Sequence, residues 1–108
     1  MEKDFGQSST LHKRIIKPEH GECFPTAVKV CQLCAKAWYV EGFIIENGER
    51  IAHGWNEING KIVDAQQPEY NGSYEPQGRC DAPTILAFVR DNDTVLPRWV
   101  STTTLKPT

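Results

Sequence analysis

Three residues in this chain carry side chains that can act together as a chemical unit: Cys23, His53 and Asp64. A thiol is weakly ionised near neutral pH, and a helix N-terminus or a neighbouring imidazole raises the fraction present as thiolate. A carboxylate next to that imidazole holds its tautomer and stabilises the imidazolium ion. The three residues therefore predict a nucleophile in Cys23, its base in His53 and the residue that orients the base in Asp64. The chemistry expected from such a set is acyl transfer or amide cleavage.

Cys23 stands at the expected start of a helix. Pro25 suits the first turn, where its missing N–H costs no hydrogen bond. Apolar residues then recur at helical spacing: Ala27, Cys31, Cys34, Ala35 and Trp38. A helix from about Phe24 to Lys36 is predicted.

Two Asn-Gly dipeptides, Asn47-Gly48 and Asn59-Gly60, indicate tight hairpin turns, because both residues of the dipeptide tolerate positive φ. The first dipeptide follows a stretch rich in aromatic and β-branched residues, which favour strands. We expect a three-stranded antiparallel meander with strands at residues 38–46, 49–58 and 61 to about 65.

The second turn sets the register that brings His53 and Asp64 together. Counting outward from Asn59-Gly60 places Trp55 opposite Asp64 and His53 opposite Gln66, so His53 and Asp64 are diagonal neighbours on one face. Diagonal cross-strand pairs lie about 7–8 Å apart at the backbone and closer at the side chains. The carboxylate of Asp64 is therefore expected to reach the imidazole.

The first turn sets the surroundings of His53 on the other side. Counting from Asn47-Gly48 places Gly42 opposite His53, so the neighbouring strand offers no side chain there, and we expect an open pocket. If the Cys23 helix packs on this face, its N-terminus brings the thiol to the other ring nitrogen. Backbone N–H groups at that terminus would stabilise an oxyanion.

The remaining segments give weaker signals. Residues 1–20 are polar with a short apolar patch, a pattern consistent with a flexible arm or a short helix. The segment from Gln66 to Arg79 is dense in turn-forming residues and is expected to be a long loop over the site. The apolar run at residues 84–89 fits either a strand or a helix, and residues 95–100 fit an edge strand.

Size and charge narrow the class of protein. A chain of 108 residues fits a single domain, residues 1–108, with one core. A formal net charge of −2, a pI of about 5.9 and scattered basic residues argue against nucleic acid as a partner.

The sequence shows neither an apolar stretch of bilayer length nor an export signal, so we expect no membrane association and a cytoplasmic location. Disulfides are then the less favoured state of its four cysteines.

The residues around the three candidates resemble the transglutaminase-like cysteine enzymes. This superfamily includes transglutaminases, arylamine N-acetyltransferases, peptide N-glycanases and the leader peptidases of lasso-peptide pathways. Three blocks carry the resemblance: Gly21-Glu22-Cys23-Phe24 entering a helix, Tyr39-Val40-Glu41-Gly42-Phe43, and His53-Gly54-Trp55-Asn56-Glu57-Ile58 followed by Gly60-Lys61-Ile62-Val63-Asp64. Gly54 stands where the superfamily usually has alanine, and Ala65-Gln66 replaces its usual Pro-Thr.

The resemblance implies an α+β fold with a helix carrying the cysteine packed on a small antiparallel sheet, as in the papain-like core. It implies Cys23 as nucleophile, His53 as base and Asp64 as orienting residue. A peptide, a protein or a small amide is the implied substrate, and neither an organic cofactor nor a catalytic metal is expected. Hydrolysis is favoured over transfer to an amine.

Two other interpretations stay open. Cys31-Gln32-Leu33-Cys34 with Cys23, Cys80 or a histidine would suit a small zinc-stabilised binding domain. Its Cys-x-x-Cys pair falls inside a periodic helix, however, where a buried apolar role is the simpler interpretation. The second alternative is a catalytically inactive domain of the same fold that binds a protein. Glu41 falls on the face opposite His53 and is expected to be structural or solvent-exposed.

Overall fold

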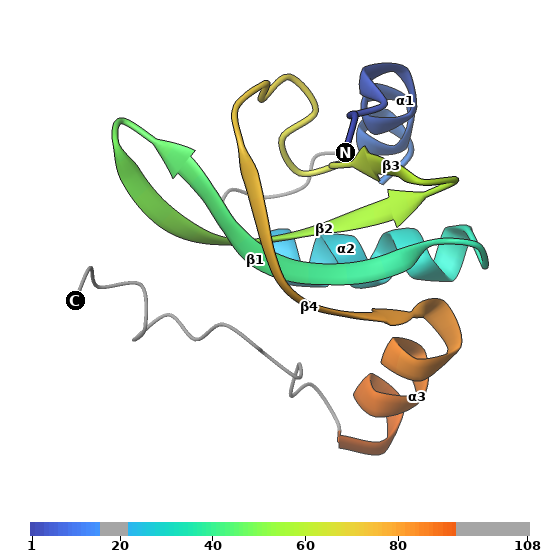
Figure 1. Cartoon of the computed structure of the whole chain (residues 1–108). Coiled ribbons are helices and arrows are strands. Elements are labelled where there is room, and N and C mark those ends of the chain that lie inside the picture. The colour runs from blue at the N-terminus through green and yellow to red at the C-terminus, as the bar shows by residue number, and fades with distance from the viewer. Residues whose placement is uncertain (16–21, 93–108) are drawn as a thin grey trace.

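The computed structural model describes residues 1–15 and 22–92 (Figure 1). Helices are present at α1 (Phe5–Ile15), α2 (Cys23–Leu33) and α3 (Ala82–Asn92). One antiparallel sheet has the order β3-β2-β1-β4 and is formed by β1 (Trp38–Glu46), β2 (Glu49–Ile58), β3 (Lys61–Val63) and β4 (Tyr74–Asp81). The α+β class expected from the sequence is confirmed.

Both hairpin turns form where the sequence predicts them. Asn47, Gly48, Asn59 and Gly60 all have positive φ, between 53° and 78°, which is the backbone of a two-residue hairpin turn. The ladder pairs Gly42 with His53, as the count from the first turn predicts. The local turn chemistry therefore fixes the register of the β1–β2 pair.

β3 is shorter than expected and ends at Val63. The N–H of Asp64 donates to Ser8 Oγ (2.9 Å), and the N–H of Gln67 donates to Asp64 Oδ1 (3.0 Å). These bonds turn the chain away from β2 after Val63. As a result, β3 pairs only with residues 56–58 of β2.

The segment expected as a long loop is partly a strand. Residues 64–73 form a connection without regular secondary structure, and β4 begins at Tyr74 and pairs with β1. A register shift between Glu41 and Gly42 accommodates β4, and a Cβ at Gly42 would lie only 2.1 Å from the Glu75 carbonyl oxygen. The space beside Gly42 that was expected to be open is therefore filled by Trp55 and β4.

The apolar run at 84–89 forms part of α3. Asp81 Oδ1 accepts a hydrogen bond from the N–H of Thr84 (3.0 Å), and Pro83 lies in the first turn, so the sequence carries a start signal for this helix. The strand expected at residues 95–100 lies outside the described residues.

The N-terminal region adds a helix and a short bridge to the sheet. α1 packs Leu11 into the core. Of the two alternatives expected for this region, residues 5–15 therefore form the short helix and not the flexible arm. Ahead of it, Lys3 forms a parallel bridge with Ile62: the Asp4 N–H donates to the Ile62 carbonyl, and the Ile62 N–H donates to the Glu2 carbonyl, both at 2.8 Å. The residues before α1 thus lie beside β3.

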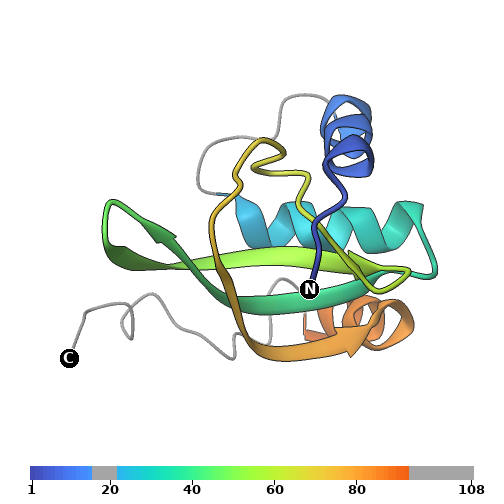
Figure 2. The same ribbon diagram turned by 45° about the horizontal axis from the view of Figure 1, so that its top comes forward.

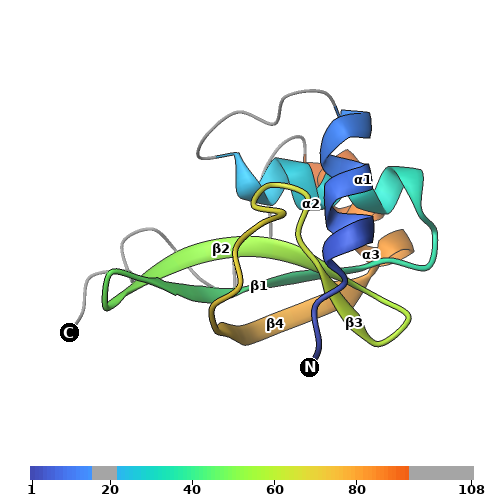
Figure 3. The same ribbon diagram turned by 90° about the horizontal axis from the view of Figure 1, so that it is seen from above.

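The sheet has two differently covered faces (Figures 2 and 3). α2 packs on one face with residues such as Phe24, Ala27 and Val30, against Tyr39 and Phe43 of β1. A smaller cluster of Val40, Trp55 and Ile62 with Tyr74 lies on the other face. None of the helices in the described part of the chain is long and apolar enough to cross a bilayer.

Candidate active site

The structure brings His53 and Asp64 together as the register predicts. His53 Nε2 and Asp64 Oδ2 lie 2.7 Å apart. Both side chains are buried, with 3% of His53 and none of Asp64 exposed to solvent. The pair is therefore sheltered from water, where its electrostatic interaction is strongest.

Asp64 is held by further donors. The hydroxyl of Tyr74 donates to Oδ2 (2.7 Å), and the N–H of Gln67 donates to Oδ1 (3.0 Å). A buried carboxylate needs such partners to replace lost water. Gln67 lies in the connection after β3 and Tyr74 is the first residue of β4, so the chain that follows β3 fixes the orientation of Asp64.

Lys3 extends this network. Its ammonium donates to Tyr74 Oη (2.9 Å) and to the carbonyls of Gln67 (3.0 Å) and Tyr70 (2.5 Å). Burial lowers the pKa of Lys3, and the nearby Asp64 carboxylate opposes that effect. Lys3 thus fastens the N-terminal segment to the connection that covers Asp64.

Cys23 is the first residue of α2, and only 8% of it is exposed. Burial lowers the pKa of His53, but hydrogen bonds to Asp64 and to Cys23 and the charges of both residues outweigh burial and raise this pKa to about 9. Because Nε2 faces Asp64, Nδ1 is the ring nitrogen left for the thiol. The imidazole therefore lies between the cysteine and the carboxylate.

α2 does not pack on the face of the sheet that carries His53, where the sequence analysis placed it. α2 packs on the face of Gly54 and Asn56, whose Nδ2 donates to the Ala27 carbonyl (3.0 Å). Side chains alternate along β2, so His53 points to the other face. There its ring stacks beside Trp55 with 6.1 Å between ring centroids. β3 has ended before this point, so the β2 edge beside His53 carries no strand in the described structure. At this uncovered edge, Cys23 at the N-terminal end of α2 reaches the imidazole of His53.

Gly54 permits this approach. A Cβ at position 54 would lie 2.8 Å from Phe24 Cδ1, 3.2 Å from Phe24 Cα and 3.3 Å from the Cys23 carbonyl oxygen. The glycine that departs from the superfamily pattern is therefore a packing requirement of this chain. An alanine would push the start of α2 away from β2.

Glu41 is buried rather than exposed. It lies on the face opposite His53, as expected, but α2 covers that face, so Glu41 has no exposed surface. Its carboxylate accepts a hydrogen bond from the Tyr39 hydroxyl. Of the two roles expected for Glu41, the buried position fits the structural one and not the solvent-exposed one, because α2 covers this face.

Sequence reasoning missed Tyr74 and Lys3. Tyr74 lies in a segment dominated by turn formers, and Lys3 lies in a polar N-terminal stretch, so neither has a local signal. Tyr70 was missed too; its hydroxyl lies 2.9 Å from the carbonyl oxygens of Ile45 and Ser73, either of which can accept its one hydrogen, and it accepts from the Ile45 N–H. Only the three-dimensional path of the connection places these residues.

The other thiols do not gather into a metal site. All four cysteines are free, and burial raises the pKa of Cys31 to about 12, which keeps it protonated. Within residues 1–15 and 22–92, no three His, Cys, Asp or Glu side chains are arranged to hold a metal ion. The ligand set of the zinc interpretation therefore receives no support from the described residues.

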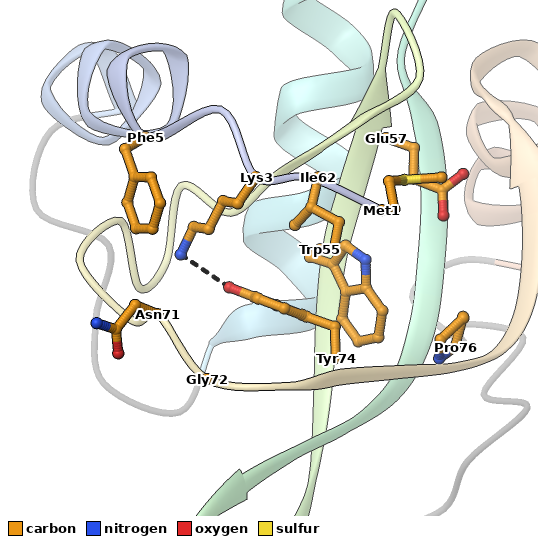
Figure 4. A pocket seen from close by; sticks show the side chains of 10 residues that line it. All are labelled: Met1, Lys3, Phe5, Trp55, Glu57, Ile62, Asn71, Gly72, Tyr74 and Pro76. Carbon is orange, nitrogen blue, oxygen red and sulfur yellow. Dashed lines mark hydrogen bonds between the residues drawn. The ribbon is translucent and has the colours of Figure 1, made fainter.

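Two cavities open near the site without including its centre. One, of about 450 Å³, is lined by residues that include Lys3, Trp55 and Tyr74 (Figure 4). The other, of about 510 Å³, is lined by His12, Glu46 and residues of the β3–β4 connection. Neither is lined by Cys23 or His53.

In comparisons with known proteins, no protein-family model, no curated protein and no solved structure matches this chain.

Proposed function

We propose that this protein is a thiol-dependent enzyme that cleaves an amide or peptide bond through a thioester intermediate. Cys23 is the nucleophile, His53 its proton-transfer partner and Asp64 the orienting residue. The observation that carries the proposal is the buried imidazole of His53, bonded to Asp64 at 2.7 Å and to the thiol of a helix-starting cysteine. A structural histidine needs no such pair of partners.

The raised pKa of His53 favours the protonated imidazole. Since this pKa is about 9, the imidazole holds its proton at neutral pH when the thiol is ionised. In the form that reacts, the Cys23 thiol has given its proton to the imidazole, and Asp64 stabilises the resulting imidazolium from the far side of the ring. His53 therefore acts first as the base toward the thiol and then as the acid toward the leaving nitrogen.

The reaction follows from this pair. The Cys23 thiolate attacks the substrate carbonyl carbon, and the imidazolium gives its proton to the leaving nitrogen as the C–N bond breaks. The resulting thioester is attacked by water, from which neutral His53 takes a proton. Collapse of that intermediate releases the carboxylic acid and restores the thiolate–imidazolium pair. Hydrolysis remains our preference over transfer to an amine.

Membership of the transglutaminase-like superfamily remains part of this proposal. The order of cysteine on a helix, histidine on one strand and aspartate after the next supports it. We also propose a cytoplasmic location, because four free thiols suit a reducing compartment.

Selective alkylation tests the proposed thiolate. The modification of each cysteine by iodoacetamide is followed by mass spectrometry between pH 5 and 9 in the wild type and in His53→Ala. Cys23 is expected to react fastest near neutral pH and to lose its advantage in His53→Ala, because the imidazolium stabilises its thiolate. Cys31 is expected to be alkylated most slowly, because it is buried.

His12→Ala is the matched control. The His12 ring bonds the Ala65 carbonyl through Nδ1 (2.8 Å), so this variant removes a half-buried histidine that is not bonded to the thiol. Its Cys23 reactivity should equal that of the wild type. If wild-type Cys23 reacts no faster than the partly exposed Cys34, the enzyme proposal fails and an inactive binding domain is favoured.

A further inference from the structure

The 450 Å³ cavity lies over the sheet face that α2 leaves uncovered (Figure 4). Its walls come from the N-terminal segment, from β2 and β3 and from the start of β4. Apolar surface is supplied by Phe5, Ile62, Trp55 and Pro76. The size and the mixed lining are those of a pocket for a small ligand.

Trp55 gives this cavity an unused hydrogen-bond donor. The residue is 1% exposed, and its Nε1 has no hydrogen-bond partner among the described residues. Buried indole N–H groups normally find an acceptor. In Figure 4 this nitrogen points toward Met1 and Glu57 at the cavity wall. A ligand acceptor placed there would satisfy it.

The charged groups of the cavity already have partners. Each of the three ammonium hydrogens of Lys3 has an acceptor in Gln67, Tyr70 or Tyr74. Glu57 is paired with Arg79 through Oε1 at 2.6 Å. A ligand that carries a net charge would therefore meet no unpaired opposite charge, and it would lose its hydration on entry.

Glu57 nevertheless offers one further acceptor. Arg79 contacts only Oε1, and no hydrogen bond within the described structure involves Oε2. Glu57 and Trp55 are two residues apart on β2, so their side chains lie next to each other on the same face. Together they present a donor and an acceptor at one wall of an apolar cavity.

We propose that this cavity binds a neutral amide with an apolar side chain, such as one unit of a peptide. The amide carbonyl accepts a hydrogen bond from Trp55 Nε1, and the amide N–H donates to Glu57. The side chain of Met1, whose residue is 68% exposed, swings away to admit the ligand. This site is separate from Cys23 and does not depend on the proposed function.

N-acetyl-L-leucinamide is a suitable probe. Titrated into ¹⁵N-labelled protein, it should produce a saturable downfield shift of the Trp55 indole proton, because a new acceptor contacts Nε1. The indole of Trp38, which is 42% exposed and lies beneath Arg79, should not shift. N-acetyl-leucine and leucinamide, which carry a charge, should bind at least roughly tenfold more weakly.

Binding of the probe to three variants distinguishes this cavity from an exposed ion pair and from the candidate active site. Glu57→Gln should weaken binding several-fold, and Glu75→Gln, which alters an exposed partner of Arg50, should not. Cys23→Ala should bind the probe as the wild type does, so this proposal and the proposed function can fail separately. A Trp55 resonance that stays in place, or that drifts without saturation together with that of Trp38, would overturn the proposal.

Discussion

Asp64 is the residue at which distant parts of the chain meet. It bonds His53 of β2 and Tyr74 of β4 through one oxygen, and its own N–H donates to Ser8 of α1. Lys3 reaches the same network through Tyr74. The orientation of the imidazole therefore depends on residues far outside the chain segment that carries the three candidate groups.

Tyr74→Phe tests this dependence at the level of one hydroxyl. The change removes a donor to Asp64 Oδ2 and an acceptor of Lys3. We expect a roughly 13- to 160-fold loss of Cys23 alkylation rate near neutral pH, equivalent to about 1.5–3 kcal/mol, the range for a hydrogen bond to a charged group. The downfield NMR signal of the His53 Nε2 proton should move upfield, because Asp64 is less firmly held.

Tyr70→Phe is its matched control. It removes a phenol hydroxyl from the connection that leads into β4, but that hydroxyl bonds the backbone at Ile45 and Ser73 rather than Asp64. Equal effects of the two changes on the His53 proton would show that general loosening of the connection, and not the bond to Asp64, is responsible.

At the scale of secondary structure elements, the approach of α2 to β2 positions the thiol. Gly54→Ala should destabilise the fold by about 1–3 kcal/mol, the usual cost of overpacking, because the added methyl meets Phe24 at 2.8 Å. It should also slow Cys23 alkylation by shifting the start of α2. Urea unfolding and mass spectrometry measure the two effects.

Gly6→Ala provides the comparison for this change. A Cβ at Gly6 meets only Asp4 Oδ1, at an ordinary 3.6 Å, inside α1. Replacing an unstrained helical glycine by alanine should leave stability unchanged or raise it by up to about 1 kcal/mol. If Gly54→Ala behaves like Gly6→Ala, the close packing of α2 on β2 is not as described.

The elements with local signals are those that the sequence predicts well. The two Asn-Gly turns define the β1–β2–β3 register, and this register places His53 beside Asp64. The face on which α2 docks has no local signal, because both faces of β2 carry apolar residues. The early end of β3 depends on Ser8, which is 56 residues away from Asp64 in the chain. Such long-range contacts arise from packing and cannot be inferred from spacing.

At the scale of the whole molecule, His53 links stability to pH. Its pKa in the folded protein is about 9, against 6.5 for an ordinary histidine. A raised pKa means that the folded state holds this proton more tightly than the unfolded state. The stabilising contribution of His53 is therefore complete below about pH 6.5 and is lost as the pH rises through about 9.

The expected loss is about 3 kcal/mol at most, since one pKa unit corresponds to about 1.4 kcal/mol. Urea unfolding at pH 6 and pH 9.5 measures it, with His53→Gln as the variant that lacks the titrating group. The wild type should lose more stability than His53→Gln over this range. A parallel decline in both proteins would assign the pH dependence to other groups.

The span of the Asp64 network also determines when it can form during protein synthesis. Cys23, His53 and Asp64 are all translated before Tyr74, and the bond between Lys3 and Tyr74 closes a loop of 71 residues. A ribosome-bound chain that ends before Tyr74 lacks β4 and the hydroxyl that holds Asp64. The thiol is therefore set in its final surroundings only when most of the chain has left the ribosome, so a nascent chain carries an incompletely assembled centre.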